Sequence, residues 1–157
     1  MTKTYQSIIS LLTERGVSFE TKHHEPTLTS EDAARIRGVA LCDGAKALVL
    51  RGKKTGKHWL FVMPADRRLD SHKAAILAGE SVSFAEDPEA VTGCVRGSVP
   101  PFGSVVGLQT FCDQRLAEHP IIHFNAGSLT DSITMAYADY ERLEQPTVVD
   151  FVQDVTS

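Results

Sequence analysis

The sequence predicts one α+β domain with a curved, mostly antiparallel mixed sheet and helices packed outside it. Segments with helical and with strand periodicity are interspersed along the chain, without the regular strand–helix–strand alternation of a parallel sheet. The 157 residues are 42% hydrophobic and 23% charged, which supplies enough apolar material for one core. No internal repeat or flexible linker divides the chain, so we expect residues 1–157 to form a single domain.

The helices are indicated by apolar spacing and by residues that start or stop helices. Residues 4–15 place apolar side chains on one helical face, and Gly16 follows as a stop signal. A second helix begins at Thr29, whose hydroxyl can cap exposed backbone amides, and it ends at Gly38. The same signals predict helices over 70–78 and 137–143, and a helical turn over 88–91.

The strands are shorter and richer in β-branched and aromatic residues. Residues 45–50 and 58–63 are separated by a loop of turn-forming residues, which predicts a hairpin that ends at Pro64. Residues 94–112 predict short strands around a special loop, and the mixed tail 146–157 is expected to pack loosely or fray. Further strands are predicted over 17–21, 81–84, 121–124 and 132–135.

The charge distribution limits the possible functions. A net charge of −4 argues against a pure nucleic-acid-binding protein, but residues 51–73 carry seven basic and two acidic side chains, a local charge of +5. This segment could hold a phosphate backbone through Lys53, Lys54 and Lys57, or it could be an ordinary solvated hairpin tip. No apolar run approaches the length of a membrane span and the N-terminus lacks signal-peptide features, so we expect a cytoplasmic protein without a membrane partner.

The cysteines and histidines do not form a recognisable metal or redox motif. Cys42, Cys94 and Cys112 are odd in number and widely spaced, so small buried hydrophobic side chains are the first interpretation and a catalytic thiol is the alternative. The His23–His24 pair and His72 have no partner at metal-ligand spacing, so no metal is expected.

Three other features are candidates for a functional site. The loop Gly97–Gly103 (GSVPPFG) combines glycines, which let backbone amides approach a ligand, with prolines that fix its shape, so it could form an oxyanion site or simply a turn. Asn125 follows an apolar strand and could bind a substrate amine or carbonyl, or belong to an Asn-Ala-Gly turn. Lys46 is a lone charge on the strand 45–50 that faces either solvent or a ligand.

Together these segments resemble the YbaK/prolyl-tRNA-synthetase-associated domain family. No nucleophile elbow, nucleotide-binding loop or zinc-deaminase motif competes with this interpretation. The resemblance covers about residues 20–143 and is carried by an ordered set of short motifs. These are His24-Glu25-Pro26 with Thr29 to Ala34, Gly44-Ala45-Lys46, Val91-Thr92-Gly93, the loop 97–103, Phe124-Asn125-Ala126-Gly127, and Ser132-Ile133.

The resemblance implies a barrel-like mixed sheet and hydrolysis, in trans, of the ester that joins a mismatched amino acid to the tRNA 3′ end. It implies no cofactor and no metal, and it implies aminoacylated tRNA as a partner, with a synthetase as a second one. A hydroxyl of the terminal ribose would assist the attack of water. Lys46, Gly97 and Ser98 would take part in catalysis, and substrate would contact His24, Thr29, Val99, Pro100, Pro101, Phe102, Gly103, Asn125, Ala126 and Gly127.

The chain departs from the commoner members of this family near the expected pocket. Cys94 replaces a frequent aromatic residue, Ser98 a frequent glycine, and Pro100 a usual Ser or Thr. The amino acid removed is therefore left open among Ala, Ser, Thr and Cys, with Thr29 to Ala34 and His24 favouring a hydroxylated one. Two other functions remain open: a noncatalytic module that binds tRNA or a synthetase, and a hydrolase of small aminoacyl esters.

Overall fold

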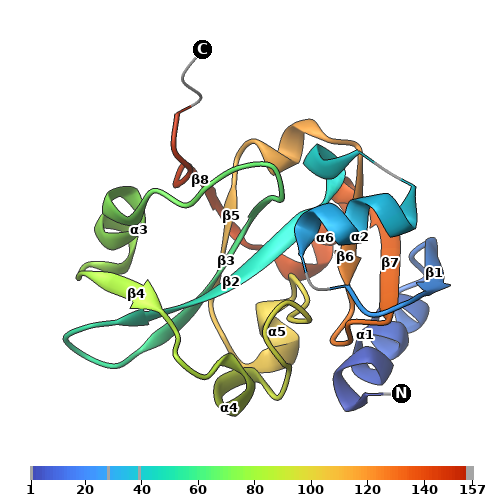
Figure 1. The fold of residues 1–157 in the computed structure, drawn as a ribbon, viewed down its shortest axis with the longest axis horizontal. Coiled ribbons are helices and arrows are strands. Elements are labelled where there is room, and N and C mark those ends of the chain that lie inside the picture. The colour runs from blue at the N-terminus through green and yellow to red at the C-terminus, as the bar shows by residue number, and fades with distance from the viewer. Residues whose placement is uncertain (1, 28, 39, 155–157) are drawn as a thin grey trace.

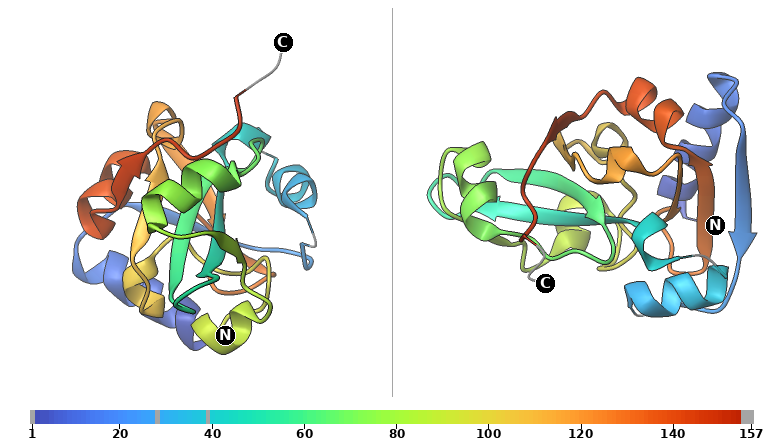
Figure 2. Two further views of the ribbon diagram at one scale, coloured as in Figure 1. Left: turned by 90° about the vertical axis from the view of Figure 1, so that its left-hand side faces the viewer. Right: turned by 90° about the horizontal axis from the view of Figure 1, so that it is seen from above.

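The computed structural model describes residues 2–27, 29–38 and 40–154, and it has the α+β architecture that the sequence predicts (Figure 1). Strands form two sheets, and helices pack around them (Figure 2). The helices are α1 (Lys3–Glu14), α2 (Ser30–Arg37), α3 (Ser71–Ala78), α4 (Pro88–Thr92), α5 (Gly103–Val106) and α6 (Tyr137–Glu144), with two 3-10 turns, η1 (Leu41–Asp43) and η2 (Leu116–Glu118).

The larger sheet has five strands and is mixed. Its centre is the predicted hairpin, in which β2 (Ala45–Gly52) runs antiparallel to β3 (His58–Pro64). The short β4 (Val82–Phe84) adds antiparallel to β2, whereas β5 (Thr110–Asp113) and β8 (Thr147–Val149) add in parallel on the side of β3. The strand order is therefore β4-β2-β3-β5-β8.

The smaller sheet has three antiparallel strands in the order β1 (Phe19–His23), β7 (Asp131–Ala136) and β6 (Ile121–Asn125). A single parallel bridge between Gly44 and His123 links it to the larger sheet at the start of β2. The described residues thus form two sheets joined at one point, and the barrel-like closure implied by the resemblance is not present in them.

The helix ends follow the signals in the sequence. The hydroxyls of Thr2 and Thr29 accept backbone amides at the starts of α1 and α2, and the carboxylate of Asp70 accepts two at the start of α3. The residues that follow α2 and α3, Gly38 and Gly79, adopt the left-handed conformation that glycine tolerates best. These caps confirm the predicted positions of the three helices.

The central sheet is buried on both faces. Along β3, Leu60 and Val62 point into a core that also contains side chains of α1, β6 and α6. The alternate residues Trp59, Phe61 and Met63 point into a second core on the opposite face, under α3 and the C-terminal segment. Because successive strand residues face opposite sides, a continuous apolar run such as 59–63 requires cover on both sides.

The segment 94–112 differs from the short strands that the sequence predicts. It contains a single strand, β5, and the helical turn α5, because Phe102 anchors the chain in the first core against Phe124 and Tyr140. The chain then turns tightly at Gly103, where a β-carbon would collide with the Thr110 side chain and the Leu108 carbonyl. Long-range aromatic packing therefore overrides the strand propensity of the local sequence.

The C-terminal tail is also more ordered than the sequence predicts. Residues 147–149 form β8, and Phe151 and Val152 are completely buried in the second core. The carboxylate of Asp113 accepts the backbone amide of Phe151 at 2.9 Å, which fixes the tail to β5. The tail therefore completes the cover of the sheet, at least as far as residue 154.

None of the helices formed by the described residues has the length and apolar character needed to cross a membrane.

The buried tail gives a test of this arrangement. Phe151→Ala should lower the free energy of unfolding by about 3–5 kcal/mol, since it removes a fully buried ring that packs edge-on against Phe61 at 4.9 Å between centroids. Chemical denaturation measures the change. Val148→Ala, in the same segment but partly exposed, should cost much less; equal small effects of both changes would show that the tail does not pack as described.

Candidate functional site

A cavity of about 380 Å³ lies beside the start of β2, next to the point where the two sheets meet. Side chains and backbone from distant parts of the chain line it. Five of the predicted site residues meet there: Thr29, Lys46, Gly97, Val99 and Asn125. The other lining residues are Thr27, Ala34, Leu41, Gly44, Ala45, Ala47, Leu48, Val49, Ala65, Phe84, Ala85, Pro88 and Arg96.

Lys46 provides an ammonium group in an otherwise mainly apolar part of the wall. It is the second residue of β2, its side chain is half-buried, and its Nζ donates to the carbonyl of Arg67 at 3.0 Å. Burial lowers the pKa of Lys46 from the ordinary lysine value, and the positive charge of Arg68 acts in the same direction, against the opposing effect of Glu31. A half-desolvated cation of this kind binds an anionic ligand more strongly than an exposed lysine does.

The Gly97 end of the predicted loop is fixed to the smaller sheet by Asn125. The Asn125 amide nitrogen donates to the Gly97 carbonyl at 2.7 Å and to the Thr27 hydroxyl at 3.2 Å. Gly97 has a φ of +86°, and one residue later the Ser98 carbonyl accepts the Gly127 amide at 2.9 Å. Asn125 thus joins three cavity-lining segments and holds the loop in one conformation.

The backbone amides of Gly97 and Val99 donate to no acceptor within the described part of the chain. Both residues line the cavity, so these N–H groups are suited to bind a ligand oxygen there. Together with the Lys46 ammonium, they give the cavity hydrogen-bond donors from two separate elements. Such an arrangement can stabilise negative charge that develops on a carbonyl oxygen.

The remainder of the predicted loop does not line the cavity. Ser98 is completely buried and its hydroxyl donates to the Val95 carbonyl at 2.7 Å. Pro100, Pro101, Phe102 and Gly103 are buried as well, and the Pro101 carbonyl accepts the Tyr140 hydroxyl at 2.7 Å. These residues support the Gly97 end of the loop from the core. The sequence motif alone does not distinguish residues with this supporting role from residues that contact a ligand.

Three more predicted residues are also not among the described residues that line the cavity. The His24 imidazole bonds with the Ser132 hydroxyl at 2.6 Å and with the Glu25 carbonyl at 2.7 Å. Ala126 is buried, and Gly127 has a φ of +79° and packs so close to α1 that a β-carbon would lie 2.8 Å from the Thr4 side chain. Their contribution is to the shape of the turn that presents Asn125.

Several cavity residues carry no sequence signal that indicates a site. Thr27 is buried beside Asn125, and Phe84 leaves 53% of its surface exposed at the end of β4. Arg96 lines the cavity while its guanidinium donates to the Ala85 carbonyl at 3.1 Å. The pairing of β4 with β2 places Phe84 opposite Leu50, and the Arg96 guanidinium bonds the chain just after β4.

The three lysines of the hairpin loop lie away from the cavity. Lys53, Lys54 and Lys57 are exposed at the tip between β2 and β3, at one end of the molecule (Figure 1). The tip is ordered, because the Glu80 carboxylate accepts the backbone amides of Lys54 and Thr55 at 2.8 and 3.0 Å. Hydrogen bonds from Thr55 are the first cause of a lowered Glu80 pKa.

Two of the three cysteines are buried, as the first interpretation of the sequence predicts. Cys94 and Cys112 are buried, and burial raises the pKa of the Cys112 thiol to about 12, which makes it unreactive. Cys42 is only half-buried. None of the three lines the cavity, which gives no support to the alternative of a catalytic thiol there.

Comparison with known proteins agrees with this geometry. The aminoacyl-tRNA editing domain family matches residues 24–143, which is most of the chain. This chain belongs to that family. The cavity and every residue that the resemblance assigned to it lie within the matched segment of the editing domain.

Relatives of this editing domain carry related names. The multifunctional Ser/Thr-tRNA deacylase ProXp-y of Escherichia coli (strain K12) is 40% identical over 154 residues, covering 94% of this chain and 92% of that protein. The prolyl-tRNA editing protein ProX of Acetoanaerobium sticklandii is 23% identical and covers 88% of both chains. A solved structure of a protein proposed to be a trans-editing enzyme for prolyl-tRNA synthetase has the same fold, with a TM-score of 0.84, 24% identity, and coverage of 98% and 99%.

The environment of Lys46 leads to a measurable titration. Because burial disfavours the ammonium form, the Lys46 side chain should titrate below the ordinary lysine range. A pH titration followed by NMR of the lysine Cε and Nζ signals measures this, with Lys46→Arg identifying the resonance by its loss. A midpoint at the ordinary lysine value would mean that the ammonium is fully hydrated and not in the cavity wall.

Proposed function

We propose that this protein is an aminoacyl-tRNA deacylase that hydrolyses the ester of mischarged tRNA in trans. The observation that carries the proposal is the convergence of Lys46, the Gly97 end of the glycine-proline loop and Asn125 on one cavity. In the reaction, water attacks the aminoacyl carbonyl, the ester C–O bond breaks, and the products are a free amino acid and a tRNA hydroxyl. The family membership and the names of the relatives support the same activity.

The roles of the residues follow from their positions. The Lys46 ammonium binds the phosphate at the tRNA 3′ end, and the Gly97 and Val99 amides bind the carbonyl oxygen as it gains negative charge. Asn125 is a positioning residue, because its amide nitrogen already donates to the Gly97 carbonyl and to Thr27. Among the described residues that line the cavity, no side-chain nucleophile is paired with a base, so the attacking group is water, assisted by the terminal ribose hydroxyl.

The wall chemistry favours a small, hydroxylated amino acid. Thr27, Thr29 and Asn125 contribute polar groups to the cavity lining, and Ala45, Ala47 and Val49 contribute small apolar side chains. A site that hydrogen-bonds a substrate hydroxyl discriminates far better than one that only measures size. We therefore propose Ser-tRNA and Thr-tRNA as substrates, in accord with the name of the 40% identical relative.

The tRNA body would extend from the cavity along β2 towards the hairpin tip. Phe84 lies opposite Leu50 at the cavity edge, and Lys53 follows seven residues after Lys46, or about 23 Å at roughly 3.3 Å per strand residue. The basic loop is therefore at a distance that only a polymer bound at the cavity would reach. We propose that Lys53, Lys54 and Lys57 bind its phosphates.

The remaining parts of the proposal concern the cellular context. The whole of residues 1–157 would act as one editing domain, since α1, outside the matched segment, contributes Tyr5, Ile8 and Leu12 to the first core. It would act in the cytoplasm, where aminoacyl-tRNA is used, and an aminoacyl-tRNA synthetase would be a second partner.

Replacement of Lys46 tests the catalytic assignment. Lys46→Met should reduce kcat/KM for deacylation by at least about a hundredfold, the effect of removing one preorganised electrostatic contact. The denaturation midpoint should not fall, because methionine fills a similar volume without a half-buried charge. The measurement is release of labelled amino acid from Ser-, Thr-, Ala- and Cys-mischarged tRNAs. Lys3→Met, an exposed lysine on α1, is the matched control.

Two outcomes would contradict the proposal. Full activity of Lys46→Met would remove Lys46 from the mechanism. Tight tRNA binding by the unmodified protein with no release of amino acid from any mischarged tRNA would identify the chain as a noncatalytic binding module instead.

Phe84 provides a separate test of how the tRNA end is bound. An exposed aromatic ring at the edge of a cation-containing cavity is suited to stack on the terminal base, which is worth about 1–3 kcal/mol by alanine substitution. Phe84→Ala should therefore raise KM by about 5- to 150-fold with little change in kcat, and Phe84→Tyr should retain the parent value. Steady-state kinetics distinguish the two parameters.

The matched control is Ile76→Ala on α3, which removes another exposed apolar side chain that does not line the cavity. The stacking role would be refuted if Phe84→Ala and Ile76→Ala had the same KM as the parent protein.

A further inference from the structure

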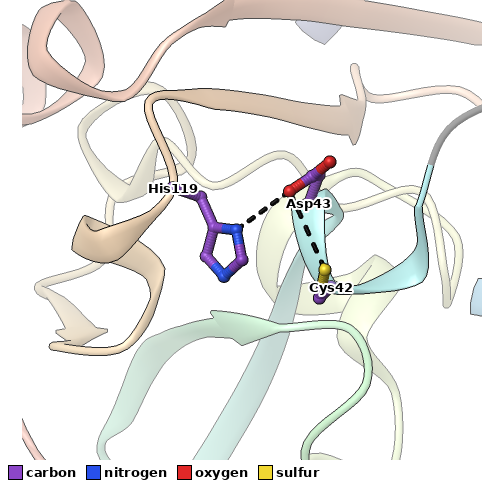
Figure 3. Close-up of side chains that lie close together, drawn as sticks. All are labelled: Cys42, Asp43 and His119. Atoms are coloured by element: carbon purple, nitrogen blue, oxygen red, sulfur yellow. Dashed lines mark hydrogen bonds and ion pairs between the residues drawn. The ribbon is translucent and has the colours of Figure 1, made fainter.

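Three potential metal ligands, Cys42, Asp43 and His119, lie close together outside the lining of the cavity (Figure 3). Cys42 and Asp43 are neighbours in η1, and His119 follows η2, 76 residues after Asp43. The His119 Nδ1 lies 2.9 Å from an oxygen of Asp43, and the Cys42 Sγ lies 3.8 Å from the same oxygen. One ligand atom from each residue lies within 4.8 Å of those from the other two.

The spacing of these atoms is close to that of a metal site. Bonds of about 2.0 Å to nitrogen and oxygen and about 2.3 Å to sulfur place tetrahedral ligand atoms roughly 3.3–3.8 Å apart. The measured separations bracket this range, so ordinary side-chain rotations would bring the three atoms onto a common ion. The two ligand-bearing segments are held together independently, because the Gly44–His123 bridge joins the chain just after each of them.

The chemistry of the donors selects the type of ion. A thiolate, an imidazole and a carboxylate together favour a borderline divalent ion such as Zn²⁺, whereas Mg²⁺ and Ca²⁺ prefer oxygen ligands alone. All three residues are half-buried, so the site is reachable from solvent and yet partly desolvated. Three protein ligands leave a fourth position for water, as in open zinc sites.

The electrostatic environment also favours a cation. The carboxylates of Asp43 and Asp66 act electrostatically on the Cys42 side chain and give this region negative charge. A divalent ion bound there would reduce the repulsion between these carboxylates and a thiolate.

We propose that Cys42, Asp43 and His119 form a binding site for a Zn²⁺-type divalent cation, with water as the fourth ligand. The site lies next to the editing cavity but does not belong to it, since Leu41 and Gly44, on either side of the Cys42–Asp43 pair, line the cavity whereas the three ligands do not. A bound ion would fix η1 against the end of η2 and so stiffen this wall. The proposal does not depend on the deacylase activity.

Cobalt substitution tests the site directly. Titration of the metal-free protein with Co²⁺ should produce a thiolate-to-cobalt charge-transfer band in the near ultraviolet and the visible bands of a four-coordinate ion, at one equivalent. Cys42→Ser should abolish the charge-transfer band. Asp43→Asn and His119→Gln should each weaken binding by at least about tenfold, and competition with Zn²⁺ should remove the cobalt spectrum.

Cys112→Ala is the matched control, because it removes a buried thiol outside the cluster and should leave the spectrum unchanged. Absence of the charge-transfer band in the parent protein, or its persistence in Cys42→Ser, would overturn the proposal. Metal-free Cys42→Ser should deacylate mischarged tRNA at the parent rate, so failure of the metal site and failure of the proposed function give different results.

Discussion

The bridge between Gly44 and His123 is the constraint on which the functional site depends. It is the one backbone pairing that joins the two sheets of the described chain, and it sits two residues before Lys46 and two before Asn125. The ammonium from the larger sheet and the carboxamide from the smaller one are therefore held at the same junction. The cavity lies beside this junction, and the small residues Gly44, Ala45 and Ala47 at the start of β2 line it.

The two ends of the glycine-proline loop have different surroundings. Gly97 and Val99 line the cavity, whereas residues 100–103 are buried and Phe102 packs against Phe124 and Tyr140. Rigid burial of the second half limits the motion of the first half. This matters for catalysis, because amides that stabilise a developing charge are effective only if they are oriented before the reaction.

Local signals in the sequence were sufficient to predict individual helices and strands, but they did not predict how distant segments pack against each other. Caps such as Thr29 and Gly79 and the two-strand hairpin have short-range causes, and the structure confirms them. The burial of Phe151, the turn at Gly103 and the presence of Phe84 in the cavity depend on contacts between distant segments, which no window of sequence contains. The family motifs located the cavity, but they did not distinguish Gly97, which lines it, from Ser98, which faces the core.

The half-burial of Lys46 is unfavourable for the stability of the folded protein. Removing an ammonium from water costs free energy, and the single Arg67 carbonyl at 3.0 Å replaces only part of its hydration. A methionine or leucine at this position would avoid that cost and would suit the apolar Leu48, which lies on the same face of β2. The unfavourable desolvation is compensated when an anion enters the cavity, because the attraction between the two charges is then exerted in a partly dehydrated space. The same low hydration that lowers the pKa of Lys46 would therefore strengthen the proposed contact with a phosphate, so a cost to the folded protein would become a gain when the proposed tRNA end binds.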